Sequence, residues 1–449
     1  MNDQLTEKRE TGMTDSLDNP QRRRLVGAAS GAALATVAGS VLLSGCATEA
    51  PAVATRKLGR VLVVGGGYGG ATAAKYIKKW GGDSIDVMLV ERERAFISCP
   101  LSNLVLGGYR KIEDLTVSYD GLRKAGILTL NDEVEAIDPA KRSVSFRKLA
   151  TQSFDRIVVA PGVDFNFGAV QGLDANAQKT VLHAWKAGPQ TVELRKQLEA
   201  MPDGGVFVLS IPRAPYRCPP GPYERVCQVA SYFKAAKPRS KIIVLDANPD
   251  IVSKKGLFLA AWNGQYPGMI EYRPNSSVTE VDLRNLTAIT ELGDKVRASV
   301  LNVVPPMGAG ALAHKSGLVN ANKLWCDVDW VTMESTAVKG IHVLGDATLS
   351  APLMPKSGHM ANQHGKAAAA AIVELMNGRT PTPITMANTC YSFVDAANVV
   401  HVASVHRFDP GKKTMVTVEG AGGLSSAANQ LEGVYANAWA RNIWNDMLT

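Results

Sequence analysis

The first clear pattern in the chain is a short apolar run that leads directly into a cluster of glycines. Residues 60–64 are mostly Val and Leu, and helix-forming residues follow from Ala71 to Trp80. An apolar run, a glycine turn and helix formers in this order predict strand, turn and helix. The turn has the glycine spacing of a dinucleotide-binding site, with its glycines at Gly65, Gly67 and Gly70.

A second apolar run, from Ile85 to Val90, ends at Glu91. This acid lies 21 residues past Gly70, where the ribose hydroxyls of a dinucleotide need an acceptor. The sequence therefore predicts an adenine dinucleotide site that includes Glu91.

Two later segments favour a flavin over a nicotinamide. Residues 154–162 predict a strand that enters a tight turn at Gly162, and residues 340–346 predict a strand that ends at Gly345 and Asp346. Asp346 could bind the ribityl chain. The predicted helix from about 357 to 371 would direct its N-terminal amides at the flavin pyrimidine. Flavoproteins of the glutathione-reductase class have this arrangement, so we expect FAD.

A second alternating pattern covers residues 172–309, with its clearest strands at 206–209 and 242–245. Here the glycine turn is replaced by a proline-rich segment that carries Cys218. We therefore predict a second doubly wound unit without a nucleotide fingerprint, and an enzyme that does not use NAD(P)H.

The predicted fold class is α/β, with two doubly wound, Rossmann-like domains of the glutathione-reductase type and a small C-terminal α+β domain. We expect a leader and linker at 1–54 and a discontinuous FAD domain at 55–171 and 310–379. The second Rossmann-like domain spans 172–309. The C-terminal domain spans 380–449 and carries β-prone runs such as 399–405 and an aromatic tail.

The N-terminus resembles a twin-arginine export leader, with Arg22, Arg23 and Arg24 before an apolar run rich in Ala and Gly. Two cleavage sites compete: a lipobox-like sequence would lipidate Cys46, whereas an ordinary signal-peptidase site would cut after Ala54. We expect a periplasmic protein, with a possible lipid anchor at Cys46. Residues 1–45 carry as many acids as bases, so the net charge of +8 belongs to the part after Gly45 and favours anionic partners or substrates; we expect no nucleic-acid partner.

Six cysteines are too few for a disulfide scaffold in a chain of 449 residues. No Cys-x-x-Cys-His motif occurs, so we expect no c-type haem on this chain, and the seven histidines show no metal spacing. Cys227 and Cys326 are expected to be buried apolar fillers.

From about Leu58 onward, the chain resembles the flavoprotein subunit of flavocytochrome c sulfide dehydrogenase, whose relatives include the sulfide:quinone oxidoreductases. The resemblance rests on several compositionally unusual segments in addition to the glycine turn: Cys99 before 101–103, then 119–123, 183–188, 217–225, 354–358 and 388–392.

The resemblance implies a thioether between Cys99 and the flavin, although Pro100 stands where the family pattern has tyrosine. It also implies a redox-active disulfide between Cys218 and Cys390; a purely structural disulfide is the alternative. Hydrosulfide would attack one sulfur and leave a persulfide and a thiolate, and the thiolate would deliver two electrons to the flavin. Glu224 matches the active-site glutamate and is a candidate acid/base, for which burial would raise the pKa usefully. Its alternative role is to stabilise a helix N-terminus.

Two further residues are less determined by the resemblance. Lys356 could place positive charge beside the reduced flavin, or could be an ordinary surface lysine. Trp439 aligns with a tryptophan at the cytochrome interface, or is a packing aromatic.

We therefore expect a sulfide dehydrogenase that oxidises hydrosulfide to zero-valent sulfur or polysulfide and passes electrons to a c-type cytochrome subunit, its heterodimer partner. One alternative is a membrane-associated sulfide:quinone oxidoreductase. Another is a non-catalytic flavoprotein partner that reactivates sulfur-oxidation proteins.

Overall fold

A five-stranded parallel sheet organises the first part of the structure, which is a computed structural model that describes residues 56–449. Its strand order is β19-β9-β1-β2-β5, and every pair of neighbours is parallel. The central strand is buried from Val61 to Val64, which explains its continuous apolar sequence. The strands are β1 (Gly59–Val64), β2 (Ile85–Glu91), β5 (Leu128–Asn131), β9 (Arg156–Val159) and β19 (Ile341–Val343).

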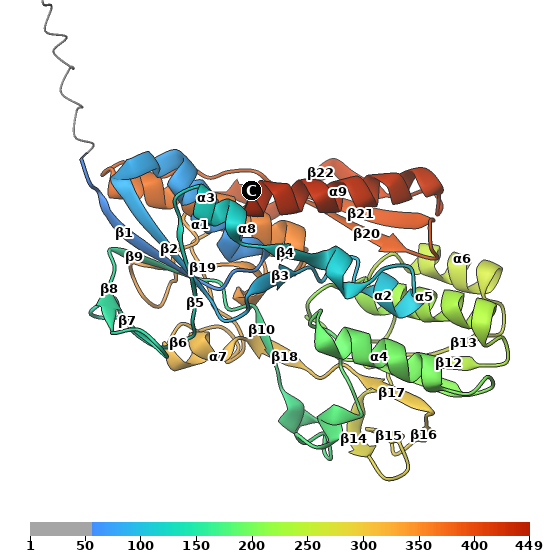
Figure 1. Ribbon diagram of the computed structural model, residues 1–449. Coiled ribbons are helices and arrows are strands. Elements are labelled where there is room, and N and C mark those ends of the chain that lie inside the picture. Colours follow the sequence, from blue (N-terminus) through green and yellow to red (C-terminus); the bar gives the residue numbers. More distant parts are fainter. Residues whose placement is uncertain (1–55) are drawn as a thin grey trace, which may run out of the picture. The chain divides into compact units, whose positions relative to one another are not determined.

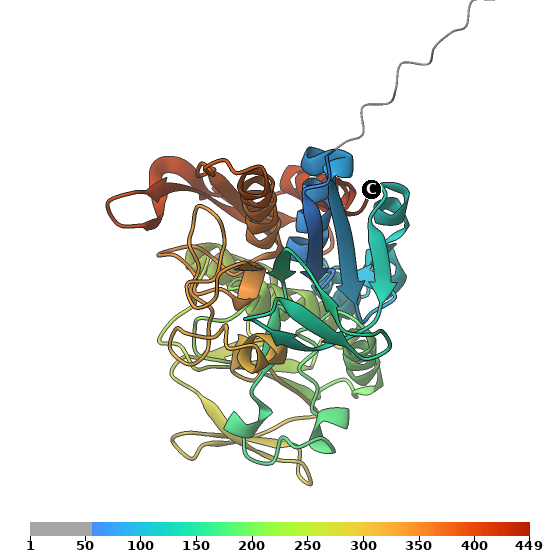
Figure 2. The ribbon, with the colours of Figure 1, turned by 90° about the vertical axis from the view of Figure 1, so that its left-hand side faces the viewer.

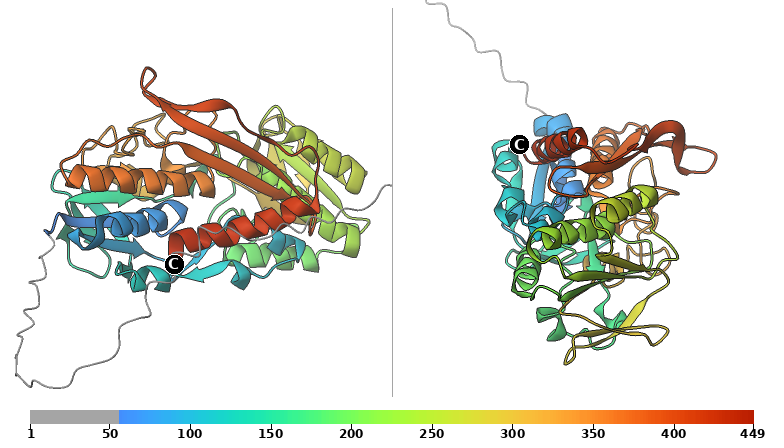
Figure 3. Two further views of the ribbon diagram at one scale, coloured as in Figure 1. Left: turned by 90° about the horizontal axis from the view of Figure 1, so that it is seen from above. Right: turned by 90° about the vertical axis from the view of Figure 1, so that its right-hand side faces the viewer.

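Two long helices, α1 (Tyr68–Gly81) and α8 (Gly358–Met376), pack against each other beside this sheet. Seen from above, they run side by side, and the C-terminal end of helix α9 (Gln430–Leu448) lies against α1 (Figure 3). Small residues on both helices allow the close packing, because a Cβ at Gly365 would collide with the backbone of α1. The remaining elements around the first sheet are short: β3 (Ala95–Ile97), α2 (Asn103–Gly107), β4 (Thr116–Ser118), α3 (Asp120–Lys124), β6 (Val134–Asp138), β7 (Ser143–Phe146) and β8 (Gln152–Ser153).

A second parallel sheet has the order β13-β12-β11-β17. Its central strands are buried and rich in Val, Ile and Leu, as expected for strands covered on both faces. The sheet comprises β11 (Val206–Ile211), β12 (Lys241–Asp246), β13 (Ile270–Arg273) and β17 (Val300–Val303). It is accompanied by α4 (Pro189–Ala200), α5 (Gly221–Ala236), α6 (Lys255–Gln265) and an antiparallel sheet of β14 (Val278–Asp282), β15 (Thr287–Thr290) and β16 (Lys295–Arg297).

The chain passes between the two parallel sheets through a pair of short antiparallel strands, β10 (Val163–Phe165) and β18 (Met307–Ala309). Figure 1 shows this pair between the two sheets, with the short helix α7 (Ala311–Lys315) beside it. The two connections therefore lie together, and the chain returns after β18 to complete the first sheet with β19.

The C-terminal part is an antiparallel sheet of β20 (Met386–Phe393), β21 (Val399–Asp409) and β22 (Thr414–Leu424), followed by α9. Figures 1 and 2 show this sheet on the same side of the molecule as α1 and α8. The strands are longer than the β-prone runs suggest, because β22 pairs with β21 on both sides of a register shift between Ser404 and His406, at which residues 418–421 are skipped. The aromatic tail is helical: Asn429 caps α9 by accepting from the amide of Glu432.

The predicted fold class is confirmed, with two parallel α/β sheets and a smaller α+β part at the C-terminus. The individual domain boundaries stay predictions. The export leader, both cleavage sites and Cys46 fall within residues 1–55, outside the described residues. No helix between residues 56 and 449 has the length and apolar character needed to cross a membrane.

Candidate active site

The glycine turn between β1 and α1 has the shape that a dinucleotide requires. Gly65 has a φ of +95°, and a Cβ there would collide with the carbonyl oxygen of Ala160. A Cβ at Gly70 would collide with the carbonyl oxygen of Gly65, so α1 begins tightly against its strand. At Gly67, by contrast, no atom of the described part of the chain lies within 4 Å of the position of a Cβ. The turn is therefore closed toward the protein and open at Gly67, where a pyrophosphate can approach the backbone.

Glu91 lies at the end of β2, directly against this turn. One of its carboxylate oxygens accepts a hydrogen bond from the amide of Gly66 at 2.6 Å, and the other accepts from the amide of Glu93 at 2.9 Å. The side chain is only partly buried. Its predicted role as a ribose acceptor stays a prediction, and its position beside the turn suits that role.

Asp346 lies after β19 in the 3₁₀ turn η5 (Gly345–Ala347). Its Oδ1 atom is buried and has no hydrogen-bond partner among residues 56–449, which is costly unless a ligand supplies one. Burial raises the pKa of its carboxyl, and the charges of Arg217 and Lys356 partly offset that effect. An orphaned acceptor at this position suits a hydroxylated chain such as the ribityl of FAD. Two glycines predicted to bind the cofactor lie in turns with positive φ, Gly162 at +65° and Gly345 at +68°. Their role in cofactor binding stays a prediction.

Lys356 is not a surface residue, which corrects one of its two expected roles. Its side chain is buried, and the ammonium donates to the carbonyl oxygens of Asp346 and Thr348. The ammonium also lies 3.7 Å from the centre of the Trp325 ring. Burial lowers the pKa of Lys356 to about 8. This lysine therefore fixes the loop that carries Asp346 and leaves positive charge next to it.

Cys99 lies in the turn between β3 and α2 and is partly exposed, as a thiol that reacts with a cofactor must be. The unexpected Pro100 is accommodated, since its carbonyl oxygen accepts from the hydroxyl of Ser98 at 2.8 Å. The left-handed backbone, with a φ of +71°, occurs one residue later, at Leu101. The thioether to the flavin stays a prediction.

Cys218 and Cys390 come from different parts of the fold and lie close enough for Cys390 to affect the ionisation of Cys218. Burial raises the pKa of both thiols, and for Cys218 the neighbouring Cys390 adds to that effect. Cys218 occupies the loop between β11 and α5 with a φ of +60°, an unfavourable backbone conformation for a side chain that is not glycine. Both cysteines are free thiols in this structure, so the disulfide stays a prediction.

A short chain of contacts links the two thiol segments. The amide of Cys218 donates to the carbonyl oxygen of Lys356 at 2.8 Å. The next residue, Ser357, caps α8 and donates its hydroxyl to Asn388 at 2.6 Å. Asn388 in turn lies 3.4 Å from the Cys390 sulfur, measured from its Nδ2. The N-terminus of α8, Lys356 and both thiols therefore form one connected group.

Glu224 occupies the first turn of α5 and is buried. Its two oxygens accept from Asn103 Nδ2 and from the amide of Phe393, both at 2.8 Å. Asn103 also accepts from Arg225, so the same amide joins a buried acid and a buried cation. Burial raises the pKa of Glu224, as the sequence-based hypothesis requires, while the bonds from Phe393 and Asn103 oppose the shift. Its role as acid/base stays a prediction.

The sequence did not identify two cations near the thiols, Arg217 and Lys254. Arg217 carries charge that interacts with Cys99, Asp346 and Cys218, and its position next to Cys218 in the sequence could have indicated it. Lys254 donates to the carbonyl oxygen of Cys390 at 2.9 Å. No comparable sequence pattern indicates Lys254 as a site residue, because it lies 136 residues from Cys390 and precedes an ordinary amphipathic helix.

Trp439 on α9 lines a cavity of about 420 Å³ with residues of α8 and β20, including His359 and Tyr391. Its indole nitrogen is buried without a partner. The ring lies edge-on to His359, with centroids 5.7 Å apart.

Cys227 and Cys326 are fully buried, as expected of apolar fillers. Among residues 56–449 no cluster of His, Cys, Asp and Glu could hold a metal ion.

Comparison with known families accounts for most of the described chain. Residues 191–305 match the central region of the flavoprotein chain of sulfide dehydrogenase (flavocytochrome c), and residues 382–448 match the flavin-binding region of flavocytochrome c sulphide dehydrogenase. Residues 59–197 match the pyridine nucleotide-disulphide oxidoreductases. This chain belongs to the flavocytochrome c sulfide dehydrogenase flavoprotein family. The flavin-binding match supports FAD as the cofactor, in agreement with the open glycine turn and the orphaned Asp346 oxygen.

Individual relatives of this flavoprotein family agree with that placement. The sulfide dehydrogenase flavoprotein chain of Chlorobaculum thiosulfatiphilum is 59% identical over 46 residues, which is 10% of this chain and 94% of that sequence. The mitochondrial sulfide:quinone oxidoreductase of Mus musculus is 24% identical over 308 residues, 64% of this chain and 65% of that protein. The aligned part thus spans slightly less than two thirds of the mouse relative. The sulfide:quinone oxidoreductase structure from Aquifex aeolicus has the same fold, with a TM-score of 0.70, 18% identity and coverage of 86% of this chain and 91% of that one.

Proposed function

We propose that this flavoprotein oxidises hydrosulfide to zero-valent sulfur or polysulfide at Cys218 and Cys390, and passes the electrons to a c-type cytochrome subunit. The observation that carries the proposal is the grouping of these two thiols with the Lys356–Asp346 loop, the predicted flavin side of the site. Family membership supports the choice of sulfide. A small anion also requires no large substrate cavity.

The proposed reaction begins with the pair as a disulfide. Hydrosulfide attacks one sulfur, a new sulfur–sulfur bond forms, the bond between the cysteines breaks, and the other cysteine leaves as a thiolate. Release of one sulfur atom and closure of the disulfide complete the cycle, in which HS⁻ yields zero-valent sulfur, one proton and two electrons. Bound FAD would accept the electron pair and release the electrons singly. Glu224, held between Asn103 and Phe393, would take the proton of hydrosulfide.

The residues present would hold FAD in a defined way. The open turn at Gly67 and the adjacent Glu91 suit the adenine dinucleotide, and Asp346 suits the ribityl chain. Cys99 would supply the covalent link. Arg217 and Lys356 provide positive charge that favours a negatively charged reduced cofactor.

An anaerobic titration of the purified protein with sulfide, followed by flavin absorbance, tests the donor. We expect sulfide to bleach the flavin and NADH to leave it oxidised. If sulfide leaves the flavin oxidised while the disulfide is reducible, the non-catalytic role in reactivating other sulfur-oxidation proteins becomes the better proposal. Peptide mass analysis of the denatured protein tests the link to Cys99, which free flavin alone would exclude.

A quinone acceptor is the second candidate, because sulfide:quinone oxidoreductases are among the relatives. Helix α9 presents Leu431, Val434 and Tyr435 to solvent on one face, each at least 50% exposed. Such a ridge suits either a partner protein or a membrane surface. Steady-state assays with a c-type cytochrome and with a soluble quinone decide between them: faster quinone reduction would replace the cytochrome in this proposal.

We also propose export by the twin-arginine route to the periplasm. The support is the leader-like sequence at 1–54, which lies outside the described residues. Cell fractionation and the mass of the mature N-terminal peptide test this proposal, and a diacylated Cys46 would establish the lipid anchor over cleavage after Ala54.

A further inference from the structure

Lys254 is a buried cation that the proposed reaction does not yet use. It stands immediately before α6, with a φ of +55°, and its side chain is buried. The ammonium donates to Cys390 O at 2.9 Å, Ser392 Oγ at 2.8 Å and Val400 O at 3.3 Å. All three acceptors are neutral, and within residues 56–449 no carboxylate forms an ion pair with it. A buried ammonium that forms no ion pair is costly, and stability alone does not explain it.

The ammonium lies on the same face of β20 as the thiol. Side chains alternate along a strand, so Asn388, Cys390 and Ser392 point to one face. Because Lys254 bonds the hydroxyl of Ser392, its charge is on the face to which the Cys390 sulfur also points. Asn388 approaches that sulfur from the other side along the strand.

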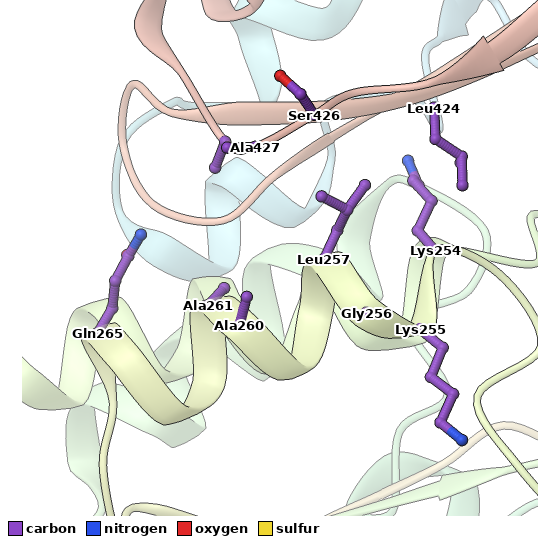
Figure 4. A pocket seen from close by; sticks show the side chains of 11 residues that line it. Lys254, Lys255, Gly256, Leu257, Ala260, Ala261, Gln265, Leu424, Ser426 and Ala427 are labelled. Carbon is purple, nitrogen blue, oxygen red and sulfur yellow. The ribbon is translucent and has the colours of Figure 1, made fainter.

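Lys254 and its neighbour Lys255 differ in direction, which gives a matched comparison. Figure 4 shows Lys254 directed toward the strand that ends at Leu424, whereas Lys255 points away from it. Lys255 pairs with the exposed carboxylate of Asp250 at 2.5 Å. The groove of about 660 Å³ that both lysines line is otherwise mostly apolar, and no acid is among its lining residues in the described chain.

We propose that Lys254 is a positioning residue that holds negative charge on the Cys390 sulfur whenever the cysteine pair is open. The inference rests on the proposed sulfide oxidation at that pair. When the disulfide bond breaks, the two sulfurs carry one persulfide group and one thiolate. Lys254 stabilises the ionised sulfur at Cys390 by its charge, and the proton goes to solvent or to Glu224.

Charged and polar groups from several elements face the Cys390 sulfur. Burial raises its pKa; Lys254 before α6, Asn388 on β20 and Ser357 at α8 lower it, and Glu224 on α5 raises it. Lys254 itself has a pKa lowered by burial to about 8, and the neighbouring acidic groups, including Cys390, Glu224, Cys218 and Glu432 on α9, oppose that shift. Its charge is therefore mostly present at pH 7 and is lost above pH 8.

The test is the pH dependence of thiol alkylation in the full-length holoprotein, reduced with dithiothreitol and desalted without oxygen. Iodoacetamide labelling at each pH, mapped by peptide mass spectrometry, gives the ionisation of Cys390 and Cys218 separately. We expect Lys254→Gln, which keeps a donor but removes the charge, to raise the apparent pKa of Cys390 by about one unit. Lys254→Arg should restore the wild-type profile, and the exposed-residue control Lys255→Gln should not change it.

The outcomes separate this inference from the proposed function, because labelling requires no sulfide turnover. In the wild-type protein Cys390 should ionise at a lower pH than Cys218, a result that needs no variant. Titration of thiolate absorbance at 240 nm on the same samples gives the ionisation without reagent access. An unchanged Cys390 profile in Lys254→Gln, an equal shift of both thiols, or a lower apparent pKa at Cys218 in the wild type would each overturn the inference.

Discussion

The two parallel sheets contain the same local arrangement, a central strand followed by a turn and a helix, and use it in opposite ways. After β1 the turn is made of glycines and is open at Gly67. After β11 the turn is a proline-rich loop that carries Cys218 in a left-handed conformation. The first arrangement leaves room for a ligand, whereas the second fills the same position with protein and places a thiol there.

The acids at the ends of the neighbouring strands show the same contrast. Glu91 at the end of β2 is partly exposed, and its carboxylate accepts from two backbone amides. Asp246 at the end of β12 is fully buried, and its Oδ2 accepts from the hydroxyls of Tyr223 and Tyr272 at 2.8 and 3.0 Å. Its Oδ1 accepts from the backbone and side chain of Asn248. In a dinucleotide-binding domain the acid at the end of this strand contacts a ribose. In the second sheet the Asp246 carboxylate is instead bonded to side chains and backbone of the protein.

The second acid also fixes the loop that carries Cys218. Asn248, oriented by Asp246, donates to the carbonyl oxygen of Pro212 at 3.0 Å and accepts from the amide of Ala214 at 2.9 Å. Tyr223 reaches the same carboxylate from the helix that follows the loop. The comparison indicates that positions open to a ligand in the first sheet support the Cys218 loop in the second, which is why we expect no response to NADH.

Replacing either thiol should have the largest effect. In Cys218→Ser or Cys390→Ser we expect sulfide-dependent flavin reduction to slow by at least about a thousandfold, because the attacked sulfur–sulfur bond cannot form. The double variant should be no slower than the single ones. Stopped-flow absorbance measures the rate, with Cys326→Ala, a buried cysteine outside the pair, as the control. Near-normal rates in either single variant would remove the cysteine pair from the mechanism.

Glu224→Gln should have the next largest effect, about a hundredfold on kcat/KM for sulfide at neutral pH. Burial raises the pKa of Glu224, so a base at this position becomes active only as the pH rises above the ordinary glutamate range. The wild-type rate should therefore increase at pH values above the ordinary glutamate range, and the variant should show a flatter profile. The exposed Glu193→Gln on α4 is the control.

The same substitution gives a stability readout with a defined sign. Because the pKa of Glu224 is raised in the folded state, its contribution to the free energy of unfolding is present below the ordinary glutamate pKa and is lost as pH rises through the raised value. Wild-type stability should fall more than that of Glu224→Gln across this interval. Parallel curves for the two proteins would contradict a raised pKa.

How far the sequence predicts the site depends on whether the contacts are local. The glycine turn, Glu91 and the Asp346 turn follow from patterns within a few residues, and the structure places them together. The burial of Lys356 could not be predicted, because it depends on Trp325 and on carbonyl groups of a folded loop. Lys254 was missed for the same reason, since its partners come from another sheet.

The fold shows the same division between local and long-range information. Strands of the parallel sheets are continuous apolar runs, so their existence could be predicted from sequence. The composition of the aromatic tail did not predict a helix. Helix α9 is stabilised by its Asn429 cap and by the burial of Ala436, Ala440 and Met447 against other elements. Pairing of residues 163–165 with 307–309 likewise has no local signal.

The Gly67→Ala variant tests whether the first turn leaves room for the cofactor. A Cβ at Gly67 meets no protein atom, so the variant should fold normally, yet the methyl group enters the space left for the cofactor. We expect about tenfold weaker flavin retention, in line with the cost of overpacking a fitted site. The ratio of flavin to protein absorbance after dialysis, measured in a Cys99→Ser background to exclude covalent retention, gives the effect. Gly264→Ala, also with open space at the Cβ, is the control.

Asn248→Ala should have the smallest effect on activity and tests the second turn directly. The variant removes both side-chain bonds to the Pro212–Ala214 segment and should reduce the free energy of unfolding by about 1–3 kcal/mol. Because the loop loses its support, Cys218 should be alkylated severalfold faster in the reduced protein, while flavin content is unchanged. The exposed Asn285→Ala provides the control for both measurements. Unchanged Cys218 reactivity together with the expected loss of stability would show that Asp246 and Asn248 stabilise the second sheet without positioning the thiol, and the two turns would then differ in occupancy alone.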